Sequence, residues 1–229
     1  FRPARYGRRD LTGESCPMNT DSKESEFTTE HFARVDQMPD EMFYSLPRLV
    51  THIDEAACAA LSAFYQSVLH NGDVILDLMS SCVSHLPASL QPGKVVGQGM
   101  NSIELQANPQ LDEFFVQNLN KSPVLPFDDN AYDACLIAVS VQYLVDPVAV
   151  FAEIGRVLKP GGVLTVSFSN RMFPTKAVAI WRAMDDADHG RLAATYLRRS
   201  ERFSDIEIGD ISPDPRRSDP LYVVTGHAV

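Results

Sequence analysis

Short apolar runs alternate along the chain with segments in which apolar residues recur at helical spacing. Residues 74–78, 94–97 and 132–139 are such runs, each bounded by turn residues, a pattern typical of parallel strands that are buried on both faces. Similar runs predict further strands over 114–116, 163–168, 203–209 and 221–226. The run over 132–139 is the most apolar of the set, so the core of the predicted fold is a buried sheet.

Helices are predicted in most of the segments between these strands. The strongest begins near Thr51, which we expect to cap it, and has Asp54 and Glu55 in its first turn, where acidic side chains interact favourably with the helix dipole. It ends at Asn71 and Gly72. Other helices are expected within 80–90 and over 102–107, 146–158, 174–184 and 186–199. The alternation predicts an α/β fold with a doubly wound, mainly parallel seven-stranded sheet, in which a C-terminal hairpin adds one antiparallel edge strand.

The domain organisation follows from the same pattern. We expect a flexible N-terminal segment over 1–27 and a single domain over 28–229, whose first part, about 28–70, forms a helical lid. Four arginines precede Met18, which indicates either an extension upstream of Met18 or the remnant of an Arg-rich transit peptide. The protein is expected to be cytoplasmic in the first case and located in an organelle in the second.

The composition narrows the classes of partner. The 229 residues carry a formal net charge of -10, whereas proteins that bind nucleic acids present basic surfaces to the phosphates. No apolar run approaches the roughly 20 residues of a membrane helix. We therefore expect a soluble protein with a small-molecule substrate, and neither a nucleic-acid nor a membrane partner. The four cysteines include no CxxC pair, so no metal site is predicted.

Polar residues stand where the predicted strands end. Ligands of doubly wound sheets bind outside the carboxyl ends of the strands, near the point where the strand order reverses. Asp77 ends the first strand, where its carboxylate either caps the following turn or faces a ligand. Asn170 and Arg171 follow the fifth strand at the same edge.

The most specific pattern is the string LPFDDNAYDACLIAVSVQYLVDPVAVFAEIGRVLKPGGVLTVSFSN over 125–170. It resembles the class I S-adenosylmethionine-dependent methyltransferases of the type 11 (UbiE-like) family, and the resemblance extends over about 73–181. The string DLMSSCVSHLP over 77–87 is similar to an uncharacterised subgroup of such domains. The resemblance implies a Rossmann-like methyltransferase fold, S-adenosyl-L-methionine as cofactor, and methyl transfer to a small-molecule acceptor.

The resemblance also implies contacts for individual residues. Those implied to contact the cofactor are Asp77, Leu78, Met79, Ser80, Ser81, Gly99, Met100, Asn101, Asn118, Leu119, Val139, Ser140 and Tyr143. Those implied to contact the substrate are Tyr44, Arg48, His85, Asn170 and Arg171. A structural role is the alternative for several of them, with Met79 and Tyr143 filling the core and His85 packed in a helix. Catalytic residues and the oligomeric state are not assigned.

The loop after the first strand departs from the family pattern Asp-x-Gly-x-Gly-x-Gly. Met79, Ser81 and Val83 occupy the three glycine positions. Glycine serves there because the backbone approaches the cofactor and adopts positive φ angles. The loop must therefore follow another path, and we expect Ser80 and Ser81 to cap the next helix and to offer their hydroxyls to the methionine carboxylate.

A second departure concerns the ribose. The family usually has an acidic residue after the second strand, and here Gly99 stands at that position. Asn101 or Glu104 is the alternative ribose contact. If the ribose lies where the resemblance implies, the substitution Gly99→Asp should tighten cofactor binding.

Two other functions remain as hypotheses. The missing glycines and ribose acid are also consistent with a catalytically inactive methyltransferase-like protein that acts as a binding or scaffold module with weak or no cofactor affinity. A nicotinamide-dependent oxidoreductase is disfavoured because no GxGxxG motif follows the first strand.

Overall fold

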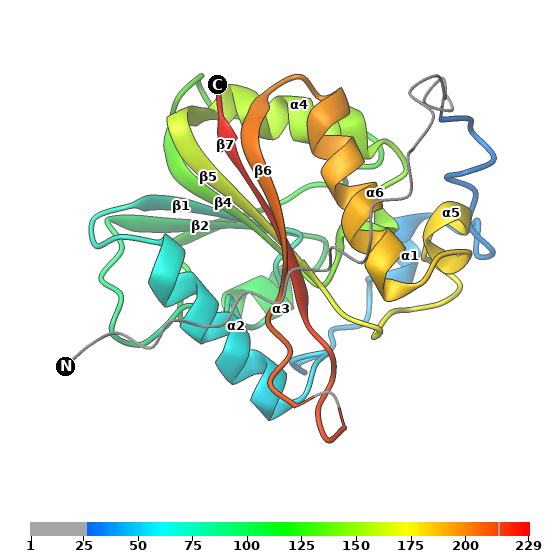
Figure 1. The fold of residues 1–229 in the computed structure, drawn as a ribbon, viewed down its shortest axis with the longest axis horizontal. Coiled ribbons are helices and arrows are strands. Elements are labelled where there is room, and N and C mark those ends of the chain that lie inside the picture. Colours follow the sequence, from blue (N-terminus) through cyan, green and yellow to red (C-terminus); the bar gives the residue numbers. More distant parts are fainter. Residues whose placement is uncertain (1–26, 215) are drawn as a thin grey trace, which may run out of the picture.

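A single seven-stranded sheet with helices on both faces forms the protein (Figure 1). The structure, a computed structural model, describes residues 27–214 and 216–229. The strand order is β3-β2-β1-β4-β5-β7-β6. The strands are β1 (Val74–Leu78), β2 (Lys94–Gly99), β3 (Glu113–Val116), β4 (Tyr132–Ala138), β5 (Leu158–Phe168), β6 (Phe203–Asp210) and β7 (Tyr222–Ala228). The predicted fold class is confirmed, while the predicted segment 1–27 lies outside the described residues except for Phe27.

The C-terminal hairpin extends the parallel part of the sheet. Strands β1 to β5 pair in parallel, whereas β7 pairs antiparallel with both β5 and β6. The antiparallel strand therefore lies inside the sheet, and β6 forms the edge. The order reverses between β1 and β4, which places the switch point beside Asp77.

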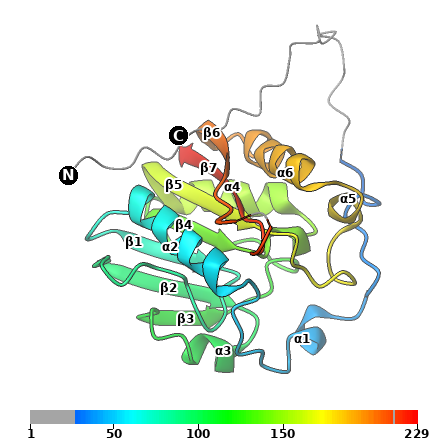
Figure 2. The ribbon, with the colours of Figure 1, turned by 60° about the horizontal axis from the view of Figure 1, so that its bottom comes forward.

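The helices form one layer on each face of the sheet. They are α1 (Asp40–Phe43), α2 (Glu55–Val68), α3 (Ser102–Gln106), the 3-10 helix η1 (Val141–Tyr143), α4 (Pro147–Val157), α5 (Ala179–Arg182) and α6 (Asp186–Arg199). Figure 2 shows α2 on one face and α4 and α6 on the other. Leu61 and Tyr65 of α2 are fully buried in a cluster with Ile75, whereas Phe151 of α4 and Leu197 of α6 belong to the cluster on the opposite face.

The predicted helix within 80–90 is wrong. The whole connection from β1 to β2 is irregular, and its Leu86 and Leu90 pack in the cluster that contains α2. Pro87 and Pro92 explain the difference, because proline disfavours helical conformation in the residue before it. Since α2 precedes β1 in the chain and already covers this face, the connection needs no helix of its own.

Two other helix boundaries also differ from prediction. The N-cap of α2 is Asp54 rather than Thr51, because the Asp54 carboxylate accepts a hydrogen bond from the backbone N–H of Ala57 at 2.8 Å. The helix predicted over 174–184 is reduced to α5, since the N–H groups of Ala179 and Ile180 donate to backbone carbonyls of the N-terminal segment. That segment therefore belongs to the folded domain. Within the described residues, no helix is long and apolar enough to cross a membrane.

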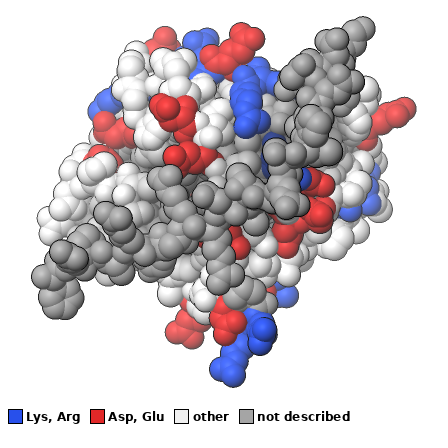
Figure 3. All heavy atoms as spheres, in the orientation of Figure 1, with Lys and Arg blue, Asp and Glu red and all other residues white. Residues whose placement is uncertain are grey.

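The surface carries both signs of charge. On the face drawn in Figure 3, acidic and basic side chains are interspersed among uncharged ones. That face therefore presents mixed charge rather than a continuous basic surface.

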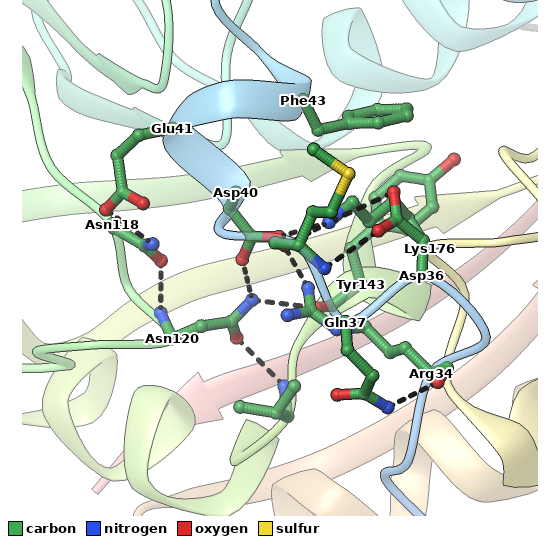
Figure 4. Close-up of polar contacts among 12 residues, drawn as sticks. Arg34, Asp36, Gln37, Asp40, Glu41, Phe43, Asn118, Asn120, Tyr143 and Lys176 are labelled. Carbon is green, nitrogen blue, oxygen red and sulfur yellow. Dashed lines mark hydrogen bonds and ion pairs between the residues drawn. The ribbon is translucent and has the colours of Figure 1, made fainter.

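A buried ion cluster fixes the N-terminal segment over the carboxyl ends of the strands (Figure 4). The Lys176 side chain is fully buried, and its Nζ lies 3.2 Å from Asp40 and 3.4 Å from Asp36. It also donates to the carbonyl of Met38 at 2.7 Å. Arg34 donates to the same Asp40 carboxylate at 2.7 Å. Two cations and two carboxylates thus join the segment before α2 to the loop after β5.

Removing Lys176 should destabilise the protein strongly. Lys176→Ala leaves Asp40 buried without one of its two cations, and breaking a buried pair in this way typically costs about 3–5 kcal/mol. The matched control is Lys94→Ala, whose 2.8 Å ion pair with Glu113 is exposed and should contribute about 0–1 kcal/mol. Urea unfolding measures both, and equal losses in the two variants would contradict the prediction.

Candidate functional site

A cavity of about 760 Å3 lies at the carboxyl ends of the parallel strands. Its floor includes Asp77 from β1, Gln98 from β2 and Ala138 from β4. Its walls come from the loops after β3 and β5, and the segment 34–54 contributes a further side. The cavity therefore occupies the switch-point position at which doubly wound sheets bind ligands.

The loop after β1 reaches the cavity by an unusual path. Met79 adopts a positive φ of 55°, which an L-residue with a side chain rarely does. Its backbone N–H donates to the Gln98 side-chain oxygen at 3.0 Å, and the N–H of Ser80 donates to the Gln98 carbonyl at 2.7 Å. Met79 thus takes a backbone conformation that glycine adopts more readily, and hydrogen bonds to Gln98 at the end of β2 hold the loop.

The two serines have roles other than the predicted helix cap, since no helix follows. Ser80 Oγ donates to Asp77 at 2.6 Å, and Ser81 Oγ donates to Glu104 at 2.8 Å. Both residues still line the cavity. Their hydroxyls satisfy carboxylates of the protein itself, so they stabilise the loop.

Gly99 has no room for a side chain. A Cβ atom there would collide with the carbonyl oxygen of Ser80 and lie 3.1 Å from Leu105 Cδ2. The expectation that Gly99→Asp restores a ribose carboxylate therefore fails on steric grounds. The two departures from the family pattern are therefore linked. The backbone of the loop after β1 occupies the space that an acidic side chain at position 99 would need.

Asn101 and Glu104 hold the N-terminal segment in place. Asn101 Oδ1 caps α3, and its Nδ2 donates to the carbonyl of Tyr44 at 2.8 Å. Glu104 accepts a hydrogen bond from the backbone N–H of Arg48 at 2.6 Å. Of the two, only Glu104 lines the cavity.

Most of the predicted site residues line the cavity, and three do not. Leu78 is a fully buried core residue, and Gly99 and Asn101 face protein atoms. The predicted residues that do line it are Tyr44, Arg48, Asp77, Met79, Ser80, Ser81, His85, Met100, Asn118, Leu119, Val139, Ser140, Tyr143, Asn170 and Arg171. Sequence reasoning missed the lining residues Arg34, Asp40, Gln98, Asn120 and Phe173.

Phe173 organises the aromatic side of the cavity. Its ring stacks on Tyr143 with the centroids 5.8 Å apart, and its backbone N–H donates to the Tyr143 hydroxyl at 2.8 Å. The His52 ring meets Phe173 edge-on at 5.6 Å, and the Arg48 guanidinium lies 5.2 Å from its centroid. In the sequence, the only indication of this role was its place in the string NRMFP after the fifth strand.

Asn118 and Asn120 connect the cavity to α1 (Figure 4). Asn118 Nδ2 donates to Glu41 at 3.0 Å, so this predicted cofactor contact already has a protein partner. Asn120 Nδ2 donates to Asp40 and to the carbonyl of Tyr143, each at 3.0 Å. The ion cluster and the loop after β3 are therefore parts of one hydrogen-bonded network.

Burial shifts the pKa values of the titratable groups in the cavity. Burial raises the pKa of Asp77 to about 6, and the hydrogen bond from Ser80 only partly opposes this. Burial and then the charge of His52 lower the pKa of His85 to about 4. Burial also lowers the pKa of His52. Such perturbed groups in a cleft are typical of functional sites.

Comparison with known proteins finds similarity to methyltransferases. A family model described as "Methyltransferase domain" matches residues 97–166. The chain is 30% identical over 120 residues to the ubiquinone/menaquinone biosynthesis C-methyltransferase UbiE of Francisella tularensis. The matched region covers 48% of this chain and 48% of that protein. Both matches agree with a resemblance to the type 11 family of class I S-adenosylmethionine-dependent methyltransferases. The resemblance seen in the sequence is thereby confirmed.

A second curated relative and a solved structure are also similar to this chain. The chain is 29% identical over 135 residues to the biotin biosynthesis bifunctional protein BioHC of Teredinibacter turnerae, covering 52% of this chain and 23% of that protein. The chain thus spans about half or less of the length of these two relatives. In fold, it is similar to the putative methyltransferase in complex with the Haloferax volcanii Trm112 activator, with a TM-score of 0.56, 18% identity, and coverage of 76% and 90%.

A methyl group at position 99 should test the contact between the loop and β2. Gly99→Ala should lower the free energy of unfolding by about 1–3 kcal/mol, as overpacking of a filled site does. The control Gly209→Ala meets only a Val223 methyl at 3.1 Å and should change stability by less than about 1 kcal/mol. Denaturant unfolding of both variants is the measurement, and an unaffected Gly99→Ala protein would show that the loop lies elsewhere.

The raised pKa of Asp77 predicts a pH-dependent gain of stability on its removal. Between pH 3.8 and about 6 the folded protein binds more protons than the unfolded chain, so wild-type stability falls as the pH rises through this window. Asp77→Asn lacks this cost and should be more stable than wild type by at most about 3 kcal/mol at pH 7.5, and by much less near pH 4. Urea unfolding at both pH values measures the difference, and a pH-independent difference would contradict the assignment.

Proposed function

We propose that the chain binds S-adenosylmethionine and transfers its methyl group to a small-molecule acceptor. Asp77 carries the proposal, because its buried carboxylate lines the cavity and pairs with no cation within residues 27–214 and 216–229. The methionine part of the cofactor has an ammonium group, and such a cation would offset the cost of ionising Asp77. The donor set of the cavity thus suits the cofactor of the family.

The other lining residues differ in how well they could bind the remaining parts of the cofactor. The Ser140 hydroxyl is buried beside the cavity without a hydrogen-bond partner among the described residues, so it is free to donate to a ligand. Leu119 offers an apolar contact to the adenine. The ribose would find Glu104, whose oxygens already accept from Arg48 and Ser81. We therefore expect a weaker ribose contribution than an unshared carboxylate would give.

The volume of the cavity suits small-molecule ligands. Pockets for ligands of this class span about 300–1,000 Å3, and this cavity measures about 760 Å3. When bound, the cofactor supplies an electrophilic methyl group on a sulfonium. The protein's part is to orient the acceptor and to exclude water, which lowers the barrier because the reactants no longer need to find each other.

The alternative of an inactive scaffold protein gains no support from the relatives, which are named as methyltransferases or biosynthetic enzymes. Its basis was the loss of loop glycines. The left-handed backbone conformation of Met79 and the hydrogen bonds that Gln98 accepts hold the loop without glycines. The loss of the glycines therefore does not argue against binding.

Calorimetry with S-adenosylhomocysteine tests the proposal through Asp77. Binding near pH 6 should release about half a proton per site, because the ligand's ammonium group favours the ionised carboxylate. Titrations in two buffers with different ionisation enthalpies measure the release. Asp77→Asn should abolish the release and weaken binding, whereas the exposed Glu113→Gln should do neither. No binding to the wild-type protein at millimolar ligand would refute the function.

A further inference from the structure

Backbone strain is concentrated around the cavity. Among the described residues, seven residues other than glycine have positive φ angles, and four of these line the cavity, namely His52, Met79, His85 and Val139. Such conformations cost energy and persist where the surrounding structure enforces them, as at active sites. Met79 is explained by the loop path. The two histidines, at φ angles of 64° and 58°, are not explained by the fold.

His85 is held on both sides by one side chain. The backbone N–H of Ser84 donates to Gln110 Oε1 at 3.1 Å, and Gln110 Nε2 donates to the carbonyl of Leu86 at 2.8 Å. Ser84 Oγ also accepts a hydrogen bond from Asn108 at 2.9 Å. Gln110 therefore positions the segment so that the His85 side chain faces the cavity.

The His85 ring is buried but has no fixed partner. It is 8% exposed and lines the cavity. Among residues 27–214 and 216–229, no hydrogen bond involves either of its ring nitrogens. Its ring nitrogens are therefore open to water or to a ligand in the cavity. The other charged and titratable residues that line the cavity are Arg34, Asp40, Tyr44, Arg48, His52, Asp54, Asp77, Glu104, Tyr143, Arg171 and Asp219.

We propose that His85 is a catalytic residue that accepts the proton of the methyl acceptor, and that the acceptor is a neutral hydroxyl, thiol or amine. The proposal rests on the proposed function. The acceptor heteroatom forms a bond to the methyl carbon while the carbon–sulfur bond breaks and leaves its electron pair on sulfur. The proton of the heteroatom passes to a ring nitrogen of His85, which becomes imidazolium and later releases the proton to solvent.

The lowered pKa of His85 suits this role. The ring is neutral at physiological pH, so it does not repel a sulfonium and its ring nitrogen can accept a hydrogen bond. A heteroatom becomes far more acidic as the new bond to carbon forms, and even a weak base then takes its proton. A carboxylate acceptor has no proton to transfer and would not need His85.

Four benzene derivatives that differ in one group provide the probes, because Phe173 and Tyr143 offer a flat aromatic wall. They are phenol, thiophenol, aniline and benzoate, each added to the protein with labelled S-adenosylmethionine. The variant is His85→Asn, since asparagine tolerates positive φ angles but is no base at these pH values. The control is His70→Asn, an exposed histidine outside the cavity.

Three readouts separate the possible outcomes. We expect phenol, thiophenol or aniline to shift the NMR resonance of the His85 ring in the S-adenosylhomocysteine complex, with no shift from benzoate. His85→Asn should slow methyl transfer about 100-fold or more while S-adenosylhomocysteine affinity stays within twofold of wild type. His70→Asn should match wild type throughout.

Failure of S-adenosylhomocysteine to bind wild-type protein would refute the proposed function itself. If it binds, the role of His85 is overturned by either of two results. One is that no protic probe shifts the His85 resonance, and the other is that His85→Asn transfers methyl groups at the wild-type rate.

Discussion

The contact between Ser80 and Gly99 is the constraint on which the rest of the site depends. The carbonyl of Ser80 fills the space that a side chain at position 99 would need. Gln98 accepts hydrogen bonds from the backbone N–H groups of Met79 and Ser80. The chain after β1 is thus held against β2 instead of turning into a helix. Because no helix follows, the cavity lacks the helix N-terminus that commonly binds anionic groups in such folds, and the binding chemistry falls to side chains.

Asp77 bears the consequence of that arrangement. With the loop drawn toward β2, the carboxylate is enclosed and has Ser80 as its hydrogen-bond donor, while burial raises its pKa. Ionised Asp77 destabilises the free protein, and a cationic ligand would offset that cost. The same carboxylate would thus lower folding stability and favour binding. His85 also lines the cavity without a protein partner for its ring nitrogens among the described residues.

The sequence sufficed for the sheet and much of the cavity, but for different reasons. Strands β4 and β5 contain short apolar runs typical of strands buried on both faces. Helix α4 begins at Asp146-Pro147, where the carboxylate caps the helix and proline occupies its first position. The helix expected within 80–90 does not form, because Pro87 disfavours helical conformation in the residue before it. Asn101 was misplaced because its side chain serves as a cap and as a donor to Tyr44, a long-range contact that no local pattern encodes.

The role of the N-terminal segment, about 28–70, depends on long-range contacts that its local sequence does not indicate. A region predicted to be a helical lid contains one long helix, α2, which packs on the sheet, and an irregular part that borders the cavity. That irregular part is held by Lys176, Asp40 and Asn120, which lie far apart in sequence. Asn120 also accepts a hydrogen bond from the N–H of Val145, so the same amide joins the segment to the loop that follows β4. The wall of the cavity beside Tyr143 is therefore positioned by the buried ion cluster. Lys176 and Asp40 thus influence the shape of the cavity even where a ligand does not contact them.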